Sequence, residues 1–192
     1  MATQPRPYLT PQQYLDIDRA AERGSEYYDG EMFPMMAVSL NHDRIFSNVN
    51  QLLGTQLEGG CCERVGSNVR VKCGLSGPYL YPDIAVFCGA PMLEDSDEDT
   101  LLDVTAIVEI LSPSTERYDR TFKFQHYRNL PSLQHYLLIA QNEVKIEHRR
   151  RQPDNSWTAI VSSDPEAVVE LPAVGCVLPI QGIYKNIQFA GR

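Results

Sequence analysis

The sequence predicts an α+β fold with a sheet core and few helices. Two amphipathic patterns predict helices near the N-terminus, one beginning at Thr10 and a longer one beginning at Asn41. Through most of the remaining chain, short apolar or alternating runs separated by proline and glycine turns predict strands. We therefore expect one α+β domain over residues 1–192.

The N-terminal elements have clear local signals. Residues 10–13 combine a helix cap, a first-turn proline and a capping-box glutamine, and they predict a helix to about Arg23. Asp29-Gly30 lies between aromatic-rich flanks and predicts a tight hairpin with Glu26 on its first strand. From Asn41, apolar residues recur at helical spacing until Gly59-Gly60 ends the pattern.

The rest of the chain predicts mainly strands. Alternation over residues 65–73 predicts one strand, and two apolar strands follow, one opened by Asp83 and one containing Glu109. Residues 117–129 predict a helix, which Pro131 closes. Further strands are expected at residues 136–139, 144–148, 157–161, 168–171 and 176–180.

Charge is unevenly distributed along the chain. The formal net charge of -8 argues against a general nucleic-acid coat, whose affinity depends on Lys and Arg. Six acids within residues 94–103 predict a solvated acidic loop. Basic residues gather in two later stretches, which predicts either a local basic face or merely a solvated helix and hairpin. These residues are Arg117, Arg120, Lys123, Arg128, Lys145, Arg149, Arg150 and Arg151.

The five cysteines form no Cys-x-x-Cys pair, so neither a disulfide framework nor a zinc knuckle is indicated. We expect buried free thiols. The N-terminal residues contain no hydrophobic signal core, and no apolar run approaches the roughly 20 residues that span a bilayer. The sequence thus predicts a cytoplasmic protein without a membrane partner.

Two acids in apolar strands are the first candidates for a functional site. Glu109 lies inside the apolar run of residues 104–111, and burying a carboxylate without a partner costs several kcal/mol or more. Asp83 opens another apolar strand directly after a proline. Two strand-borne acids suggest one shared cation. The alternatives are that Asp83 caps a turn and that Glu109 only forms a buried ion pair with Lys123.

Four motifs occur in order and carry a family resemblance. They are Tyr-Pro-Asp83-Ile-Ala-Val, Ile-Val-Glu109-Ile-Leu-Ser-Pro-Ser-Thr, Tyr-Asp119-Arg-Thr-Phe-Lys123 and Leu133-Gln-His-Tyr-Leu-Leu-Ile. From the first helix to about Arg150, the chain resembles the Uma-type putative restriction endonucleases of the PD-(D/E)XK nuclease superfamily, a family formerly filed as a domain of unknown function. The resemblance implies a restriction-endonuclease-like core, with a mixed central sheet flanked by helices and extra β-hairpins.

The resemblance also implies roles for individual residues. Asp83 and Glu109 would hold Mg²⁺, or Mn²⁺, and Glu26 would supply a third carboxylate. The usual catalytic lysine follows the second acid by two residues, where this chain has Leu111. Members of the family carry the lysine on the following helix, and Lys123 stands at the matching position. His42 also matches a family position and is a candidate supporting residue.

The function implied is metal-dependent hydrolysis of phosphodiester bonds in DNA, with Asp83, Glu109 and Lys123 as catalytic residues. Two alternatives remain: a nuclease fold that serves as a non-catalytic binding or regulatory module, and a cupin-like metal enzyme. The second would need clustered histidines, and the four histidines show no such spacing. Because one such site cuts one strand, double-strand cleavage predicts a homodimer. Six tyrosines near the N-terminal elements and the Asp83 strand could stack bases, but core packing explains them equally well.

Overall fold

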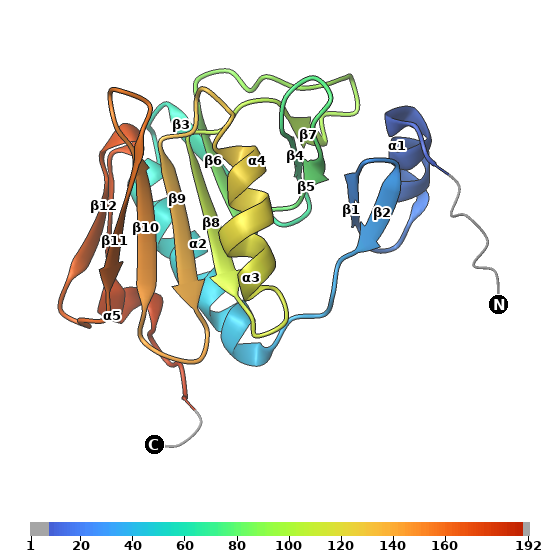
Figure 1. The fold of residues 1–192 in the computed structure, drawn as a ribbon. Coiled ribbons are helices and arrows are strands. Elements are labelled where there is room, and N and C mark those ends of the chain that lie inside the picture. The colour runs from blue at the N-terminus through green and yellow to red at the C-terminus, as the bar shows by residue number, and fades with distance from the viewer. Residues whose placement is uncertain (1–7, 190–192) are drawn as a thin grey trace.

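The computed structural model describes residues 8–189, which form a mixed α+β fold with few helices (Figure 1). The helices are α1 (Pro11–Ala20), α2 (Leu40–Leu57), α3 (Glu116–Tyr118), α4 (Phe124–Tyr127) and α5 (Ile180–Ile183), with a π-helical segment (Asp119–Lys123) between α3 and α4 and a 3-10 turn (Pro172–Val174). The strands are β1 (Ser25–Tyr28), β2 (Glu31–Pro34), β3 (Cys62–Gly66), β4 (Arg70–Lys72), β5 (Tyr79–Leu80), β6 (Ile84–Cys88), β7 (Thr100–Leu101), β8 (Ala106–Leu111), β9 (His135–Ala140), β10 (Ile146–Arg151), β11 (Trp157–Ser162), β12 (Val168–Leu171) and β13 (Cys176–Pro179).

The N-terminal elements form as their local signals predict. The Thr10 hydroxyl accepts a hydrogen bond from the Gln13 backbone, and the Gln13 side chain accepts one from the Thr10 backbone, so the capping box is complete. Helix α1 ends at Ala20, three residues before the predicted Arg23. At the hairpin tip, Asp29 and Gly30 both have positive φ (46° and 80°), which is typical of a type I′ turn. This turn fixes the register that places Glu26 on β1.

Two sheets carry the site. The smaller has the order β2-β1-β5-β4-β7, and the larger has the order β11-β10-β9-β8-β6-β3. Within the larger sheet, β8 and β9 are parallel, whereas β6 runs antiparallel to β8. The predicted single strand over residues 65–73 is wrong, because a turn closed by the Val69 N–H to the Gly66 carbonyl divides it. Its first part belongs to the larger sheet and its second part to the smaller.

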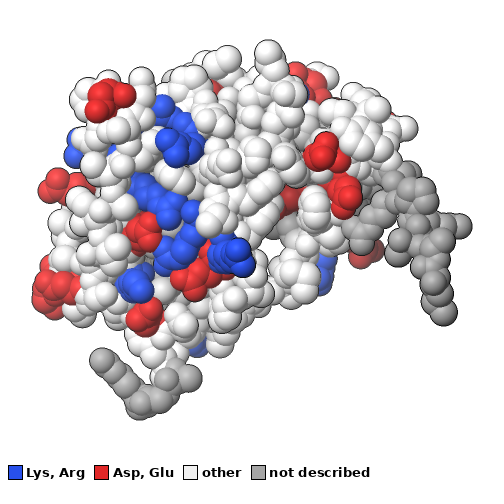
Figure 2. All heavy atoms as spheres, in the orientation of Figure 1, with Lys and Arg blue, Asp and Glu red and all other residues white. Residues whose placement is uncertain are grey.

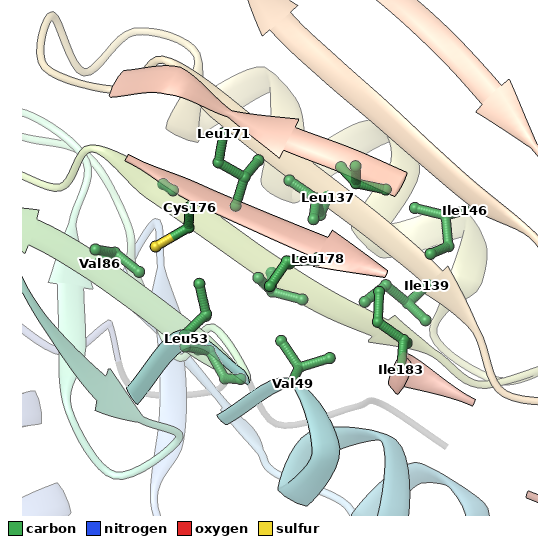
Figure 3. Packing of buried hydrophobic residues seen from close by; sticks show 14 of the residues in the cluster. Val49, Leu53, Val86, Leu137, Ile139, Ile146, Leu171, Cys176, Leu178 and Ile183 are labelled. Atoms are coloured by element: carbon green, nitrogen blue, oxygen red, sulfur yellow. The ribbon is translucent and has the colours of Figure 1, made fainter. Parts of the chain in front are cut away.

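Apolar layers cover both faces of the larger sheet (Figure 1). On one face, α2, α5 and the β12–β13 hairpin enclose a cluster in which Val49 and Leu53 approach Leu137 and Leu178 (Figure 3). On the other face, Tyr127 and Tyr136 belong to a second buried cluster near α4. Full burial of one aliphatic side chain, such as that of Leu53, contributes about 1.5–3 kcal/mol to the stability of the fold. Side chains of β6 and β8 are packed into both layers beneath the site.

Three of the six tyrosines that could stack bases lie in the core, whereas Tyr8 and Tyr28 are exposed. Tyr14, Tyr27 and Tyr79 are buried together, with the rings of Tyr14 and Tyr27 stacked at 4.8 Å. These three rings are core residues and are not available to stack on bases. Within residues 8–189, no helix has the combination of length and apolarity that crossing a membrane requires.

The expectation of free thiols is wrong for two cysteines. Cys62 and Cys88 face each other in the antiparallel register of β3 and β6 and form a disulfide. Cys73 and Cys176 are buried free thiols, as expected, while Cys61 is free and exposed. The 26-residue separation of the bonded pair gives no local signal, because their contact depends on strand register.

The acidic loop is also more ordered than its composition predicts. Arg19 on α1 forms ion pairs with Asp95, Asp97 and Asp99 at 2.7–2.8 Å. Arg70 on β4 is buried and pairs with Asp99 as well. The loop therefore ties α1 to the smaller sheet instead of being fully solvated.

Candidate active site

Asp83 and Glu109 come together because β6 and β8 are neighbours. Ile84 pairs with Val108, so Asp83 lies opposite Glu109 where β6 begins. The Asp83 Oδ2 atom accepts a hydrogen bond of 2.6 Å from the Ile110 backbone N–H, which fixes the orientation of this carboxylate. Glu109 is 2% exposed, although both acids line the same cleft. The structure thus brings together the two acids that the sequence singles out.

Glu26 reaches the same place from the N-terminal hairpin. Its Oε1 atom accepts a hydrogen bond of 3.1 Å from the Tyr81 backbone N–H. Its Oε2 atom accepts one of 2.8 Å from the Tyr118 hydroxyl. Contacts from two different parts of the chain therefore hold this carboxylate beside the other two.

Lys123 lies at the centre of the acids. Its Nζ atom is 3.1 Å from Glu26 Oε1 and 3.1 Å from Glu109 Oε1. It donates hydrogen bonds of 3.2 Å to Glu109 Oε2 and 2.9 Å to the Tyr81 carbonyl. The lysine occurs at the end of the π-helical segment, a rare helix form that often marks functional sites.

Asp119 is a site residue that the sequence analysis did not select. It is 3% exposed, and its Oδ1 atom lies 3.7 Å from Lys123 Nζ. The two residues are four positions apart, and the wide π-helical turn lets both face the cleft. The Tyr-Asp119-Arg-Thr-Phe-Lys123 motif could have pointed to Asp119, because residues four apart on a helix are neighbours and Asp119 precedes Lys123 by four.

His42 supports Asp83 from the first turn of α2. The Ser39 hydroxyl caps this helix by accepting a hydrogen bond from the His42 backbone N–H. The His42 Nε2 atom lies 3.3 Å from Asp83 Oδ1, while its Nδ1 atom is buried without a hydrogen-bond partner. The position suits a residue that orients Asp83.

Burial and charge act in opposite directions at this site. Burial raises the pKa of Glu109 well above its usual range, although the Lys123 ammonium opposes this rise. Burial also raises the pKa of Asp119. For Lys123, burial alone would lower the pKa, but the carboxylates of Glu109, Glu26 and Asp119 outweigh it and hold the pKa well above 10.5. The lysine therefore remains an ammonium, and Glu109 and Asp119, with their raised pKa values, bind protons more readily than exposed acids do.

The cleft has a charged floor and less polar walls. Its volume is about 520 Å³. One wall consists of residues 33–39, from the end of β2 to the start of α2, and the other consists of residues 112–115, between β8 and α3. Glu26, Asp83, Glu109 and Lys123 line the floor.

The donor chemistry fits a hard divalent cation, but the arrangement is not a ready-made metal site. Within residues 8–189, no group of three or more His, Cys, Asp or Glu side chains is placed to hold a metal ion as it stands. The Lys123 ammonium lies among the carboxylates instead. Glu109 Oε1 is buried and accepts no hydrogen bond of good geometry, although the Lys123 ammonium lies 3.1 Å away, and carboxylate oxygens are the preferred ligands of Mg²⁺. Binding such an ion at Asp83, Glu109 and Glu26 would require Lys123 or the carboxylates to shift.

A basic surface lies beside the site. Figure 2 shows Lys and Arg side chains, with acids among them, over the region where Figure 1 places β10 and helices α3 and α4. Arg120 pairs with Glu147, and Arg149 donates a hydrogen bond of 2.9 Å to the Arg120 carbonyl. Arg151 similarly donates to the Arg128 carbonyl. Arg120, Arg128, Arg149 and Arg151 therefore form, with Arg117 on α3, one face that we call the basic face. Lys123 lies in the cleft instead, and Arg150 points to the opposite side of the sheet beside His148.

Comparisons with known proteins show the family and the fold of this chain. Residues 11–181 match the model of the Uma2 family, described as putative restriction endonuclease. Two uncharacterized proteins of Synechocystis sp. are relatives. Protein slr1290 is 32% identical over 96% of both chains, and sll1609 is 34% identical over 78% of this chain and 84% of its own. A crystal structure of a putative nuclease of DUF820 from Anabaena variabilis shares the fold, with a TM-score of 0.72, 20% identity and coverage of 88% of this chain and 93% of that one.

Proposed function

This chain belongs to the Uma2 family of putative restriction endonucleases, and we propose that it is a metal-dependent nuclease that hydrolyses phosphodiester bonds in DNA. One observation carries the proposal. Three carboxylates from three separate segments, Glu26, Asp83 and Glu109, line one cleft together with the ammonium of Lys123. Assembling such costly buried charges at a surface cleft favours a functional site over a purely structural one.

The carboxylates would bind Mg²⁺ or Mn²⁺, which when bound polarises the scissile phosphate and lowers the pKa of a coordinated water. Asp83 is oriented for this role by the Ile110 N–H and by His42. Glu26 is oriented by the Tyr118 hydroxyl and the Tyr81 N–H. In this proposal, His42 is a positioning residue.

Lys123 would take the role of the displaced catalytic lysine. Leu111, at the usual position, has a side chain that can neither donate a hydrogen bond nor carry charge. The ammonium of Lys123 is 3.1 Å from Glu109 Oε1, close enough to donate to a phosphate oxygen held on the same floor. Stabilising the charge that develops on the phosphate in this way contributes a few kcal/mol in comparable sites, about 2.7–4.

The basic face would hold the DNA backbone beside the cleft. Arg117 and Arg128 are its exposed members. Contacts from such side chains to phosphates position the duplex without selecting a sequence. Cutting both strands would require two copies of the chain, so we also propose a symmetric homodimer, which light scattering with DNA present would detect.

A non-catalytic binding or regulatory module remains the second candidate, and one observation favours it. The carboxylates of Glu26, Glu109 and Asp119 already pair with the Lys123 ammonium. The protein itself therefore neutralises part of the negative charge that a metal ion would neutralise. The cupin-like alternative gains no support. His135 and His148 do contact each other at 3.0 Å, but within residues 8–189 no third His, Cys, Asp or Glu side chain joins them to hold a metal.

A plasmid-nicking assay tests the proposal. We expect supercoiled DNA to be nicked with Mg²⁺ or Mn²⁺ and to remain intact with EDTA. Glu109→Gln and Asp83→Asn should each lower the rate by at least about 100-fold, whereas Glu63→Gln, an exposed strand glutamate, should retain it. Absence of cleavage with every divalent ion, while the protein still binds DNA, would favour the non-catalytic module.

A further inference from the structure

The segment that runs from the end of β2 to the start of α2 is strongly apolar for an exposed stretch of chain. Residues 33–39, which we call the apolar strap, have the sequence Phe-Pro-Met-Met-Ala-Val-Ser. Phe33 is 44% exposed, Met36 is 76% exposed and Val38 is 58% exposed. Contiguous exposed apolar side chains commonly mark a binding surface.

The apolar strap forms a wall of the candidate active site. Every residue from 33 to 39 lines the cleft whose floor carries Glu26, Asp83 and Glu109. A ligand that fills this cleft must therefore combine two chemistries. It must be ionic where it meets the floor and apolar where it meets the strap.

We propose that the apolar strap binds the base of an unpaired nucleotide whose phosphate lies on the carboxylate floor. This inference rests on the proposed function, which places a phosphodiester at Asp83 and Glu109. A nucleotide has both required chemistries, an anionic phosphate and a flat base with an apolar face. The volume of about 520 Å³ lies within the range of roughly 300–1,000 Å³ that small-ligand pockets occupy, which suits a single nucleotide and not a duplex.

The base must be unpaired to reach the strap. Inside a duplex, both faces of a base are covered by neighbouring base pairs, so a protein side chain reaches a base face only in a single strand or after the base swings out. The substrate favoured by this cleft is therefore a single strand, or a duplex at a site where one nucleotide is extruded. Intact, fully paired DNA should bind mainly through the basic face.

The side chains of the strap predict recognition of any base without a preference for one. Met35 and Met36 have flexible, polarisable thioethers that contact aromatic rings without directional hydrogen bonds. The strap's single hydroxyl, on Ser39, is already engaged, because it donates to Gln141 and accepts from the His42 N–H. Removing the base should therefore lower the binding affinity more than exchanging one base for another.

Binding measurements on the full chain test the inference independently of cleavage. The probe is a short fluorescent DNA strand with phosphorothioate linkages, used with Mg²⁺ and checked on a gel to remain intact. A second strand lacks the central base but keeps its sugar and phosphate. We expect the complete strand to bind about three- to tenfold more tightly, the range that a methionine–ring contact supports.

Met36→Ser should lower affinity for the complete strand to that of the abasic strand. Met92→Ser is the matched control, because Met92 is also exposed (57%) but lies outside the cleft. Equal binding of the two strands by the parent protein, an equal loss from Met92→Ser, or no binding of either strand would each overturn the inference. Base-dependent binding without hydrolysis of an ordinary phosphodiester strand would refute the proposed catalytic function but leave the strap inference intact.

Discussion

Replacing Lys123 with methionine should expose how far the site depends on its internal cation. The ammonium is buried within 3.1 Å of both Glu26 and Glu109 and 3.7 Å from Asp119. Breaking a buried ion pair by removing one partner costs about 3–5 kcal/mol, because the other charge remains buried. For a chain of this size, 1 kcal/mol corresponds to roughly 2–4 °C, so the melting temperature of Lys123→Met should fall by roughly 6–20 °C at pH 7.

The stability that Lys123→Met loses should depend on pH and on divalent cations. At pH 5 it should be smaller, because the pKa of Glu109, raised by burial, lets this acid bind a proton and become neutral. Added Mg²⁺ should restore stability to Lys123→Met, by about 2.7 kcal/mol at 100 times its Kd, because the cation takes the place of the ammonium among the acids.

The assays are thermal unfolding for the melting temperature and urea unfolding for the free energy, each at pH 5 and pH 7, with Mg²⁺ and with EDTA. Lys72→Met serves as the control, since Lys72 forms a partly buried ion pair with Glu94 outside the site. The Lys72→Met variant should lose less stability than Lys123→Met, and Mg²⁺ should stabilise it no more than it stabilises the parent. The reasoning fails if Lys123→Met is as stable as the parent at pH 7, or if Mg²⁺ stabilises both variants equally.

Three further predictions concern orientation, DNA contact and pH. Tyr118→Phe removes the hydroxyl that holds Glu26, so the cleavage rate should fall about fivefold or more, while the free energy of unfolding falls by only about 1 kcal/mol. An unchanged cleavage rate would show that this hydrogen bond is unimportant for activity. Arg117→Gln and Arg128→Gln should each reduce the slope of log affinity for duplex DNA against log salt by about 1 if the basic face contacts phosphates, and fluorescence anisotropy over a salt series measures this. Because the folded-state pKa of Glu109 is raised, its contribution to stability is present in full below the unfolded pKa and declines as pH rises through the folded value. Mg²⁺ should make this decline in stability smaller, and its binding should release protons from the site. Calorimetry in buffers of different ionisation enthalpy would detect the released protons, and binding without proton release would contradict the prediction.

The elements that the sequence predicts well are those with local causes. The capping box at Thr10, the Asp29-Gly30 turn and the apolar stripe of α2 each act within a few residues, and each element forms where its signal lies. Asp83 and Glu109 were also recognisable, because an acid in an apolar strand conflicts with its surroundings. The convergence of these two acids follows from the pairing of their strands.

The features that were missed depend on contacts between distant segments. The Cys62–Cys88 disulfide follows from the register of β3 against β6, which the composition of neither strand reveals. The acidic loop is ordered by Arg19, some 76–80 positions earlier in the chain. Asp119 stands four residues before Lys123 in a motif visible in the sequence, but its burial beside the lysine depends on contacts of the π-helical segment with the rest of the site, which the motif does not reveal.

The most direct test of the account is to locate a metal ion in crystals of the protein grown with Mn²⁺, using anomalous scattering. The account predicts one strong peak within about 2.0–2.3 Å of carboxylate oxygens of Asp83 and Glu109, with Glu26 beside it and Lys123 Nζ moved away from its contact with Glu109. No peak in this cleft, or a peak confined to the acidic loop of residues 94–103, would contradict the assignment of the site.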